Sequence, residues 1–354
     1  MSIHQVLVGA RAGDAITQMA VQLQGPLARF GDSQIFARHV DATKAHRVRH
    51  LPELAAQCRP GDIVILHVSI GDELVWDAVL GSGARVWVSY HNITPAELFA
   101  DDPHFASMLT LGREQLQRHR DRIEHVVTES EFNRMDLESM GFHDVEVLPG
   151  LLDPFRLHGL PSDPHFGNQV HHRAPGPLLL FVGQILPHKR PDLLVAAHHL
   201  LTAHHRPDAT LVLAGHHPVP RFAQQVSNYA ASLGLSHRVW LTGGIDDARL
   251  AELYRRADVF VTASRHEGLC LPVLEAFAMS VPVVVADHGA LPETVEDCGI
   301  VVRNDSPPDF AEAMLMALDP DVHHRYVTAG RRRARERSLV RAQEAAVACY
   351  EKWI

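Results

Sequence analysis

The segment Arg265–Pro282 reads RHEGLCLPVLEAFAMSVP and sets two glutamates, Glu267 and Glu275, eight positions apart. The run DVFVTAS at 258–264 precedes it, and such a short β-branched run predicts a buried parallel strand. Residues 270–279 are apolar on almost every side, which predicts a buried helix. We therefore expect a strand-to-helix junction, with Glu267 in its loop and Glu275 inside the helix.

A carboxylate inside that helix needs a partner. Burying Glu275 alone would cost several kcal/mol, so it either pairs with a cation or binds a ligand rich in hydroxyl groups. Gly268 precedes the first helical turn, where Cys270 and Leu271 offer unpaired backbone N–H groups at the positive end of a helix dipole. Such a helix start is suited to binding a phosphate group.

The pattern E-G-L-C-L-P-V-L-E-A-F-A-M-S-V-P-V-V, from Glu267 onward, resembles the nucleotide-sugar-dependent glycosyltransferases of family 4. The resemblance implies an α/β protein of the GT-B fold: two Rossmann-like, doubly wound parallel-sheet domains facing a central cleft. It also implies that Glu275 holds the donor ribose, that Glu267 contacts the donor sugar, and that transfer retains the anomeric configuration without a metal. Leu269 and Cys270 stand where the family has Phe-Gly, so we expect a stiffer loop and a differently shaped donor pocket.

Strand-like and helix-like runs alternate along the chain, as expected for parallel sheets covered by helices on both faces. We expect an acceptor-side domain over 1–160, a nucleotide-sugar-binding domain over 171–336, and a terminal helix over 337–354 that crosses back to the first domain. The stretch 151–177 is rich in Pro, Gly and His without periodicity and is interpreted as a linker. The expected strands are 5–9, 62–67, 84–90 and 125–129, then 178–183, 209–214, 238–242, 258–263, 281–286 and 299–302.

Composition agrees with two ordinary cores. The 354 residues are 46% hydrophobic, and the four cysteines are scattered without a C-x-x-C pair, which favours neither a disulfide framework nor a zinc ribbon. The first residues lack a basic stretch followed by a long apolar run, and no window approaches about 18 consecutive apolar residues. We expect a cytoplasmic protein that is neither secreted nor membrane-spanning.

In this architecture ligands bind beyond the carboxyl ends of the strands. The run from Gly183 to Lys189 resembles the V-G-R-x-x-x-x-K segment of the family, whose Arg and Lys neutralise the donor pyrophosphate. Lys189 matches, but Gln184 replaces the Arg, and an amide cannot make bidentate charge-assisted hydrogen bonds. Arg190 is a candidate to compensate.

Three more loops after strands belong to the expected site. Gly244 and Ile245 resemble the loop that holds the donor base, and residues 287–293 (DHGALPE) resemble the family's G-G-x-P-E turn. In the first domain, the turn over 9–14 contains Gly13 and is expected to close over phosphate.

The sequence Tyr90-His-Asn-Ile-Thr-Pro95 follows a predicted strand and resembles a segment found in a subset of these transferases. His91 matches the histidine that lines the donor sugar and the acceptor, where it could donate a hydrogen bond or orient the attacking hydroxyl. His67 ends another strand and is a weaker candidate for the same site. A lone His is more often structural, and this chain has 26 of them.

Other features are interpreted as structural. Adjacent His-His pairs such as His198 and His199 diverge on a helix and lack the i,i+4 partner that a helical metal site needs. The D-x-D at Asp319–Asp321 follows a helix and is expected to be a turn. The arginine-rich run over 331–337 is expected to be a solvated helix face, which excludes a nucleic-acid partner.

We therefore expect a metal-independent, retaining glycosyltransferase that takes a nucleoside diphosphate sugar as donor and needs no cofactor, with His91 and Glu267 as catalytic residues. Two alternatives stay open: a nucleotide-sugar epimerase of the same fold, and a noncatalytic nucleotide-sugar-binding subunit. Residues 1–170 carry 22 Asp and Glu against 14 Lys and Arg. This acidic balance favours a soluble neutral or cationic acceptor over an anionic lipid. The sequence leaves the oligomeric state open.

Overall fold

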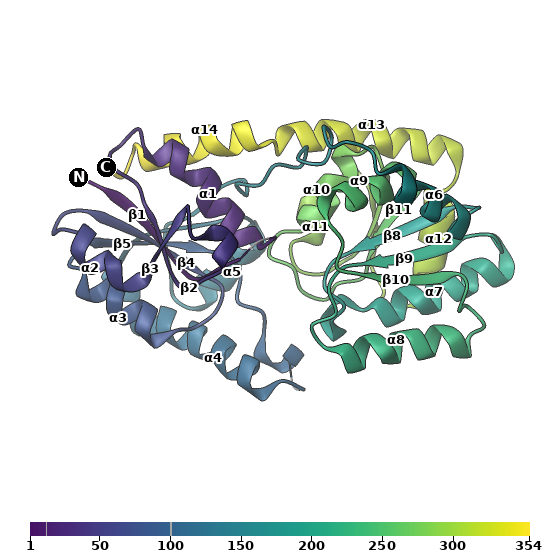
Figure 1. Cartoon of the computed structure of the whole chain (residues 1–354), viewed down its shortest axis with the longest axis horizontal. Helices are drawn as coiled ribbons and strands as arrows, with labels where there is room; N and C mark the ends of the chain where they lie inside the picture. Colours follow the sequence, from purple (N-terminus) through teal and green to yellow (C-terminus); the bar gives the residue numbers. More distant parts are fainter. Residues whose placement is uncertain (12, 100) are drawn as a thin grey trace. The chain divides into compact units, whose positions relative to one another are not determined.

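The computed structural model describes residues 1–11, 13–99 and 101–354, which divide into two compact units. Unit 1 comprises Met1–Leu152 with Leu339–Ile354, and unit 2 comprises Asp153–Ser338. Each unit is a fully parallel sheet with helices on its faces (Figure 1). The α/β class that the sequence predicts is therefore confirmed.

Unit 1 has a seven-stranded parallel sheet in the order β3-β2-β1-β4-β5-β6-β7. Successive strands are added on one side from β1 to β3 and on the other side from β4 to β7, so the strand order reverses between β1 and β4. Its strands are β1 (Ile3–Ala10), β2 (Ile35–Val40), β3 (Val48–His50), β4 (Ile63–Val68), β5 (Arg85–Tyr90), β6 (Ile123–Thr128) and β7 (Val145–Val147). Its helices are α1 (Ala15–Leu27), α2 (Leu54–Gln57), α3 (Glu73–Gly81), α4 (Pro103–Arg118), α5 (Glu131–Ser139) and α14 (Leu339–Tyr350). Short 3-10 turns are η1 (Ala42–Lys44), η2 (Leu51–Glu53), η3 (Ala96–Phe99) and η4 (Arg120–Arg122).

Unit 2 has a six-stranded parallel sheet in the order β10-β9-β8-β11-β12-β13, and its strand order reverses between β8 and β11. Its strands are β8 (Leu178–Val182), β9 (Thr210–Ala214), β10 (Val239–Gly243), β11 (Val259–Thr262), β12 (Val283–Ala286) and β13 (Ile300–Val302). Its helices are α6 (Pro164–Arg173), α7 (Pro191–His204), α8 (Pro220–Ser232), α9 (Asp247–Arg256), α10 (Leu271–Ala278), α11 (Leu291–Val295), α12 (Pro307–Ala317) and α13 (Pro320–Glu336), with the 3-10 turn η5 (Pro187–Lys189).

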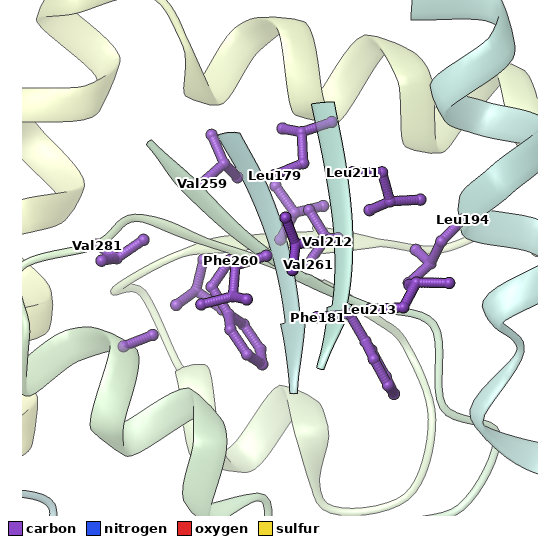
Figure 2. Close-up of a cluster of buried hydrophobic side chains, with 14 of the residues drawn as sticks. Leu179, Phe181, Leu194, Leu211, Val212, Leu213, Val259, Phe260, Val261 and Val281 are labelled. Atoms are coloured by element: carbon purple, nitrogen blue, oxygen red, sulfur yellow. The ribbon is translucent and has the colours of Figure 1, made fainter. Parts of the chain in front are cut away.

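The core of unit 2 explains why its strands are easily read from the sequence. Figure 2 shows the aliphatic and aromatic side chains of β8, β9 and β11 gathered on the two faces of the sheet, among them Leu179, Leu211 and Phe260. These three side chains are fully buried. A fully buried side chain of this kind contributes about 1.5–3 kcal/mol relative to its exposed state. Strands covered on both faces therefore appear as continuous apolar runs, and all six predicted strands of unit 2 form.

Unit 1 holds three strands that the sequence reading omits, β2, β3 and β7. β3 and β7 are three residues long and lie at the two edges of the sheet, and β2 carries exposed residues in its second half. Such strands depend on pairing with a neighbour more than on their own apolar pattern. Ser130 caps α5, accepting a hydrogen bond from the Asn133 backbone N–H.

The predicted linker over 151–177 is wrong, because this segment belongs to the core of unit 2. Leu157, Phe166 and Val170 are buried in that core, and α6 forms within the segment. The boundary between the two units along the chain therefore follows Leu152, and does not lie within 160–171 as expected. At the other end of the chain, α14 packs against α1 in unit 1, so residues 339–354 lie with the first sheet.

Arg333 departs from the solvated face expected over 331–337. Its side chain is buried and donates to the carbonyl oxygens of Glu293 (2.8 Å) and Thr294 (3.2 Å) at the end of α11. Arg331, Arg332 and Arg335 are exposed as expected. Asp319 begins α13 as its N-cap, so the D-x-D motif is a helix start.

Candidate functional site

Glu275 lies inside α10, as the sequence predicts, and is 1% exposed. Its carboxylate accepts a hydrogen bond from Arg156 Nε at 2.6 Å and from the Tyr254 hydroxyl at 3.1 Å. Burial raises the pKa of Glu275 above its ordinary value, and the Arg156 guanidinium offsets part of that effect. The buried charge therefore has the cation partner that its position requires.

Arg156 connects Glu275 to the start of α9. Its Nη1 lies 2.6 Å from an Asp247 carboxylate oxygen, so one guanidinium pairs with two carboxylates from different helices. The sequence reading missed Arg156 because it lies in the segment interpreted as a linker. Tyr254 was missed as well, since nothing local distinguishes it from a core tyrosine.

Glu267 and Lys189 meet where the sheet order reverses. Lys189 follows β8 and Glu267 follows β11, and these two strands are neighbours at the reversal. Lys189 Nζ lies 2.6 Å from Glu267 Oε1, with both side chains largely shielded from solvent. A crevice beyond the strand ends at such a reversal is the usual ligand site of open parallel sheets. The structure thus brings together two residues that sequence reasoning placed in one site.

The loop over 287–293 fixes the backbone of Glu267. The Ala290 N–H donates to the Glu267 carbonyl oxygen at 2.8 Å, and Gly289 has φ +57°. A Cβ atom on Gly289 would lie within 2.8 Å of the Glu267 backbone nitrogen and 2.7 Å of its carbonyl oxygen. Only glycine therefore allows this close approach.

A second cluster lies beside this pair, around Asp305. Its carboxylate is 3.7 Å from Arg190, 3.5 Å from Arg265 and 2.8 Å from His288. Arg190 adopts the left-handed conformation, with φ +52°, and also contacts Asp192 at 3.1 Å. Gln184 is exposed at the end of β8. Arg190, the candidate to replace the missing Arg, thus donates hydrogen bonds to Asp192 and forms a longer ion pair with Asp305.

The remaining predicted donor residues surround the same strand ends. Gly183 directly follows β8, and Gly268, Leu269 and Cys270 lead into α10, whose first residue is Leu271. Among the described residues, no side chain caps the start of α10. Pro272 carries no N–H and the Val273 N–H donates to the Cys270 carbonyl oxygen at 3.1 Å, so Leu271 supplies the N–H of the first turn that is available to a ligand. Cys270 is buried, and desolvation raises the pKa of its thiol well above the ordinary value.

Gly244 and Ile245 line a cavity of about 300 Å³ together with Thr242, Trp240 and three side chains of α6. A Cβ on Gly244 would lie 2.2 Å from the His216 ring, so a larger residue here would have to displace this exposed side chain. Asp247, which Arg156 joins to Glu275, begins α9 two residues after Ile245. The predicted base-binding loop and the buried glutamate are therefore coupled through one arginine.

Unit 1 carries a separate buried polar chain that includes both predicted histidines. His91 contacts Glu129 through Nδ1 and His67 through Nε2, the latter at 2.7 Å. His67 Nε2 in turn lies 3.0 Å from Gln5 Oε1. Sequence reasoning missed Glu129, which directly follows β6, and Gln5, in the middle of β1. A carboxylate directly after a buried strand was the available signal for Glu129.

Gly13 lies directly before Asp14, the N-cap of α1, and has φ +76° with open space around its α-carbon. Residue 12 of the predicted 9–14 turn lies outside the described residues. Within the described part of the chain, no three His, Cys, Asp or Glu side chains gather closely enough to hold a metal ion. None of the described helices is long and apolar enough to cross a bilayer.

Comparison with solved structures identifies the architecture. The Anabaena protein HepE, solved in complex with UDP, aligns with a TM-score of 0.79 at 15% identity, over 99% of this chain and 100% of HepE. Sucrose-phosphate synthase from Thermosynechococcus elongatus aligns at 0.78 with 19% identity, over 100% of this chain and 99% of the synthase. The fold is GT-B. At these identities the likeness concerns the fold alone.

Sequence comparison finds a family match within the second unit. Residues 166–333 match the family described as Glycosyl transferases group 1. A D-inositol 3-phosphate glycosyltransferase from Nocardia farcinica is 30% identical over 245 residues, 68% of this chain and 53% of the relative. An alpha-maltose-1-phosphate synthase from Mycolicibacterium smegmatis is 35% identical over 172 residues, 45% of this chain and 43% of the relative. The chain thus spans about half the length of these two curated relatives. The matched region contains Lys189, Glu267 and Glu275, and these comparisons support a glycosyltransferase.

Proposed function

We propose that this protein transfers a sugar from a nucleoside diphosphate sugar to a hydroxyl acceptor. The observation that carries the proposal is the buried Glu275 of α10, held by Arg156 and Tyr254 beside a helix start without a capping side chain. A carboxylate there can accept hydrogen bonds from the two ribose hydroxyls, and the helix start can bind the diphosphate. Solved GT-B neighbours in complex with UDP or UDP-glucose support a donor of this class.

Lys189 and Glu267 supply the chemistry next to the diphosphate. The ammonium group of Lys189 can stabilise the charge that develops on the departing diphosphate, and Glu267 can accept hydrogen bonds from donor sugar hydroxyls. In the free protein these two groups neutralise each other at 2.6 Å. A bound donor would insert between them, giving each group a substrate partner. Gly183, Gly244, Ile245 and Gly268 to Leu271 complete the proposed donor site.

For the finer chemistry we propose retention of the anomeric configuration, with His91 of unit 1 among the residues that contact the sugar. The epimerase alternative needs acid and base groups around the sugar, and Glu129 and His67, the partners of His91, are groups of that kind. Both ring nitrogens of His91 are bonded to protein side chains, so His91 offers no free proton acceptor. This observation favours the transferase.

Thermal unfolding with a panel of nucleoside diphosphate sugars tests the proposal. A donor present at about 100 times its dissociation constant should stabilise the protein by about 2.7 kcal/mol, and Glu275→Gln should reduce that stabilisation. Hydrolysis or transfer assays with the stabilising donor then separate a transferase from a noncatalytic binding protein. Absence of stabilisation by every donor tested would contradict the proposal.

We also propose that transfer needs no metal, because Lys189 and the start of α10 can meet the phosphate charge. Activity measured after treatment with EDTA should equal that of the untreated enzyme, and added Mn²⁺ or Mg²⁺ should not increase it. Loss of activity in EDTA with recovery in Mn²⁺ would show that a divalent ion takes part.

A further inference from the structure

Four adjacent strands of unit 1 contribute to one buried hydrogen-bonded chain. Gln5 lies on β1, His67 on β4, His91 directly after β5, and Glu129 directly after β6, in the same order as the strands of the sheet. The side chains of His91 and Glu129 are 4% and 8% exposed, and His67 is 3% exposed. The His67 and His91 rings are parallel, with an interplanar angle of 1°. Such a continuous buried network has a defined number of hydrogens, because each contact needs one.

Gln5 fixes the first hydrogen. Its amide Nε2 donates to the Ala20 carbonyl oxygen of α1 at 2.9 Å, which turns Gln5 Oε1 toward His67. Oε1 carries no hydrogen, so His67 Nε2, 3.0 Å away, must donate. Burial lowers the pKa of His67 well below its ordinary value, and its neutral ring therefore keeps Nδ1 as an acceptor.

The second and third hydrogens follow from the first. His91 Nε2 lies 2.7 Å from the acceptor His67 Nδ1, so His91 Nε2 donates. His91 Nδ1 contacts a Glu129 carboxyl oxygen, and that contact also needs one hydrogen, on the nitrogen or on the oxygen. Both forms contain one hydrogen more than a carboxylate with two neutral imidazoles, and both have no net charge.

The surroundings favour this neutral arrangement. From α5, Asn133 Nδ2 lies 3.4 Å from the other Glu129 oxygen; from α1, Met19 and Leu23 present apolar side chains to the same small cavity. The other titratable group lining that cavity, among the described residues, is Tyr350 of α14. Burial raises the pKa of Tyr350, and Glu129 raises it further, so its hydroxyl stays neutral. No other charge reaches the triad from the described cavity lining.

We propose that Glu129 is a positioning residue for His91, and that one hydrogen shared by Glu129 and His91 Nδ1 keeps the Nε2–H of His91 as a donor. The adjoining cavity, which His91, His67 and Glu129 all line, is about 20 Å³ and too small for a sugar ring, so a sugar oxygen can reach His91 only from outside this cavity. His91 Nε2 can donate its hydrogen to a sugar oxygen in place of His67 Nδ1. The positioning role rests on the proposed glycosyl transfer, whereas the number of hydrogens in the buried chain does not.

Glu129→Gln separates hydrogen bonding from charge. The glutamine amide can donate to His91 Nδ1 and so mimics the protonated acid, keeping every contact in the chain while removing the ionisable group. The variant should therefore fold. Glu131→Gln is the matched control, because Glu131 is exposed in the first turn of α5.

The hydrogen count is tested by two-bond ¹H–¹⁵N spectra of the full-length protein labelled at histidine, with His67→Gln and His91→Gln used for assignment. We expect Nε2 of both rings to carry hydrogen near neutral pH, in wild type and in Glu129→Gln. An unprotonated Nε2 on either ring in the wild type would overturn the proposal, whatever reaction the protein catalyses.

The positioning role is tested by kinetics with the donor identified above. Glu129→Leu, which cannot hydrogen-bond to His91 Nδ1, should lower kcat about tenfold or more with a smaller change in the donor KM. Glu129→Gln, which keeps that contact, should retain most of the wild-type rate, and Glu131→Gln should match wild type. An active wild type with unchanged kcat in Glu129→Leu, or an equal loss in Glu129→Leu and Glu129→Gln, would overturn this role. A wild type that transfers no sugar would refute the proposed function instead.

Discussion

At the scale of single residues, Glu275 offers the sharpest test of the donor site. Replacing it by Gln keeps the side-chain shape and removes the charge. Arg156 would still contact Asp247 at 2.6 Å, so the substitution leaves no unpaired buried cation and the protein should fold. We expect weaker nucleotide binding and a loss of about tenfold or more in kcat/KM, equivalent to about 1.4 kcal/mol.

Glu267→Gln provides the comparison for this prediction. Glu267 is expected to contact the sugar and not the nucleoside, so its substitution should reduce turnover more than nucleotide affinity. Steady-state kinetics together with calorimetric titration of the nucleoside diphosphate distinguish the two patterns. A folded Glu275→Gln protein with wild-type kinetics would contradict the ribose role assigned to Glu275.

At the scale of elements, Arg333 joins α13 to the end of α11. It donates hydrogen bonds to two carbonyl oxygens in the last turn of that helix, and it places a cation at the negative end of the helix dipole. Arg333→Met should therefore cost about 2 kcal/mol, because it removes these hydrogen bonds of a buried guanidinium. For a unit of this size that loss lowers Tm by about 4–8 °C.

The matched variant is Arg335→Met, which changes the same residue type on the same helix at an exposed position. Its effect should stay within about 0.5 kcal/mol. Differential scanning calorimetry of both variants and the wild type measures the difference. Equal melting temperatures for Arg333→Met and Arg335→Met would mean that the buried contacts contribute nothing measurable.

At the scale of the whole molecule, the charge of unit 1 bears on the acceptor. The arginines of α4 and η4 are the strongest candidate for a basic patch, yet Arg113 pairs with Asp136, Arg118 with Glu73, and Arg120 with Asp121. Each free Lys or Arg near an anionic leaflet contributes about 1 kcal/mol to membrane binding, and these pairs remove most of that attraction. We propose a soluble neutral or cationic acceptor.

Sedimentation with anionic liposomes at physiological salt checks this proposal, with neutral liposomes as the control. We expect little protein in either pellet. Strong co-sedimentation with anionic vesicles alone, weakening as salt is raised, would indicate a lipid acceptor instead.

The sequence by itself determined the α/β class, the six strands of unit 2 and the placement of Glu267 and Lys189 at one edge of its sheet. It could do so because doubly covered strands appear as apolar runs and because ligand residues follow strand ends. Only the tertiary structure decided that Arg156 holds Glu275, and that Gln5, His67, His91 and Glu129 form one chain. These contacts join residues far apart in sequence, and no local pattern encodes which strands become neighbours. The short edge strands β3 and β7 depend on the same long-range pairing, and for that reason they too had no readable signal.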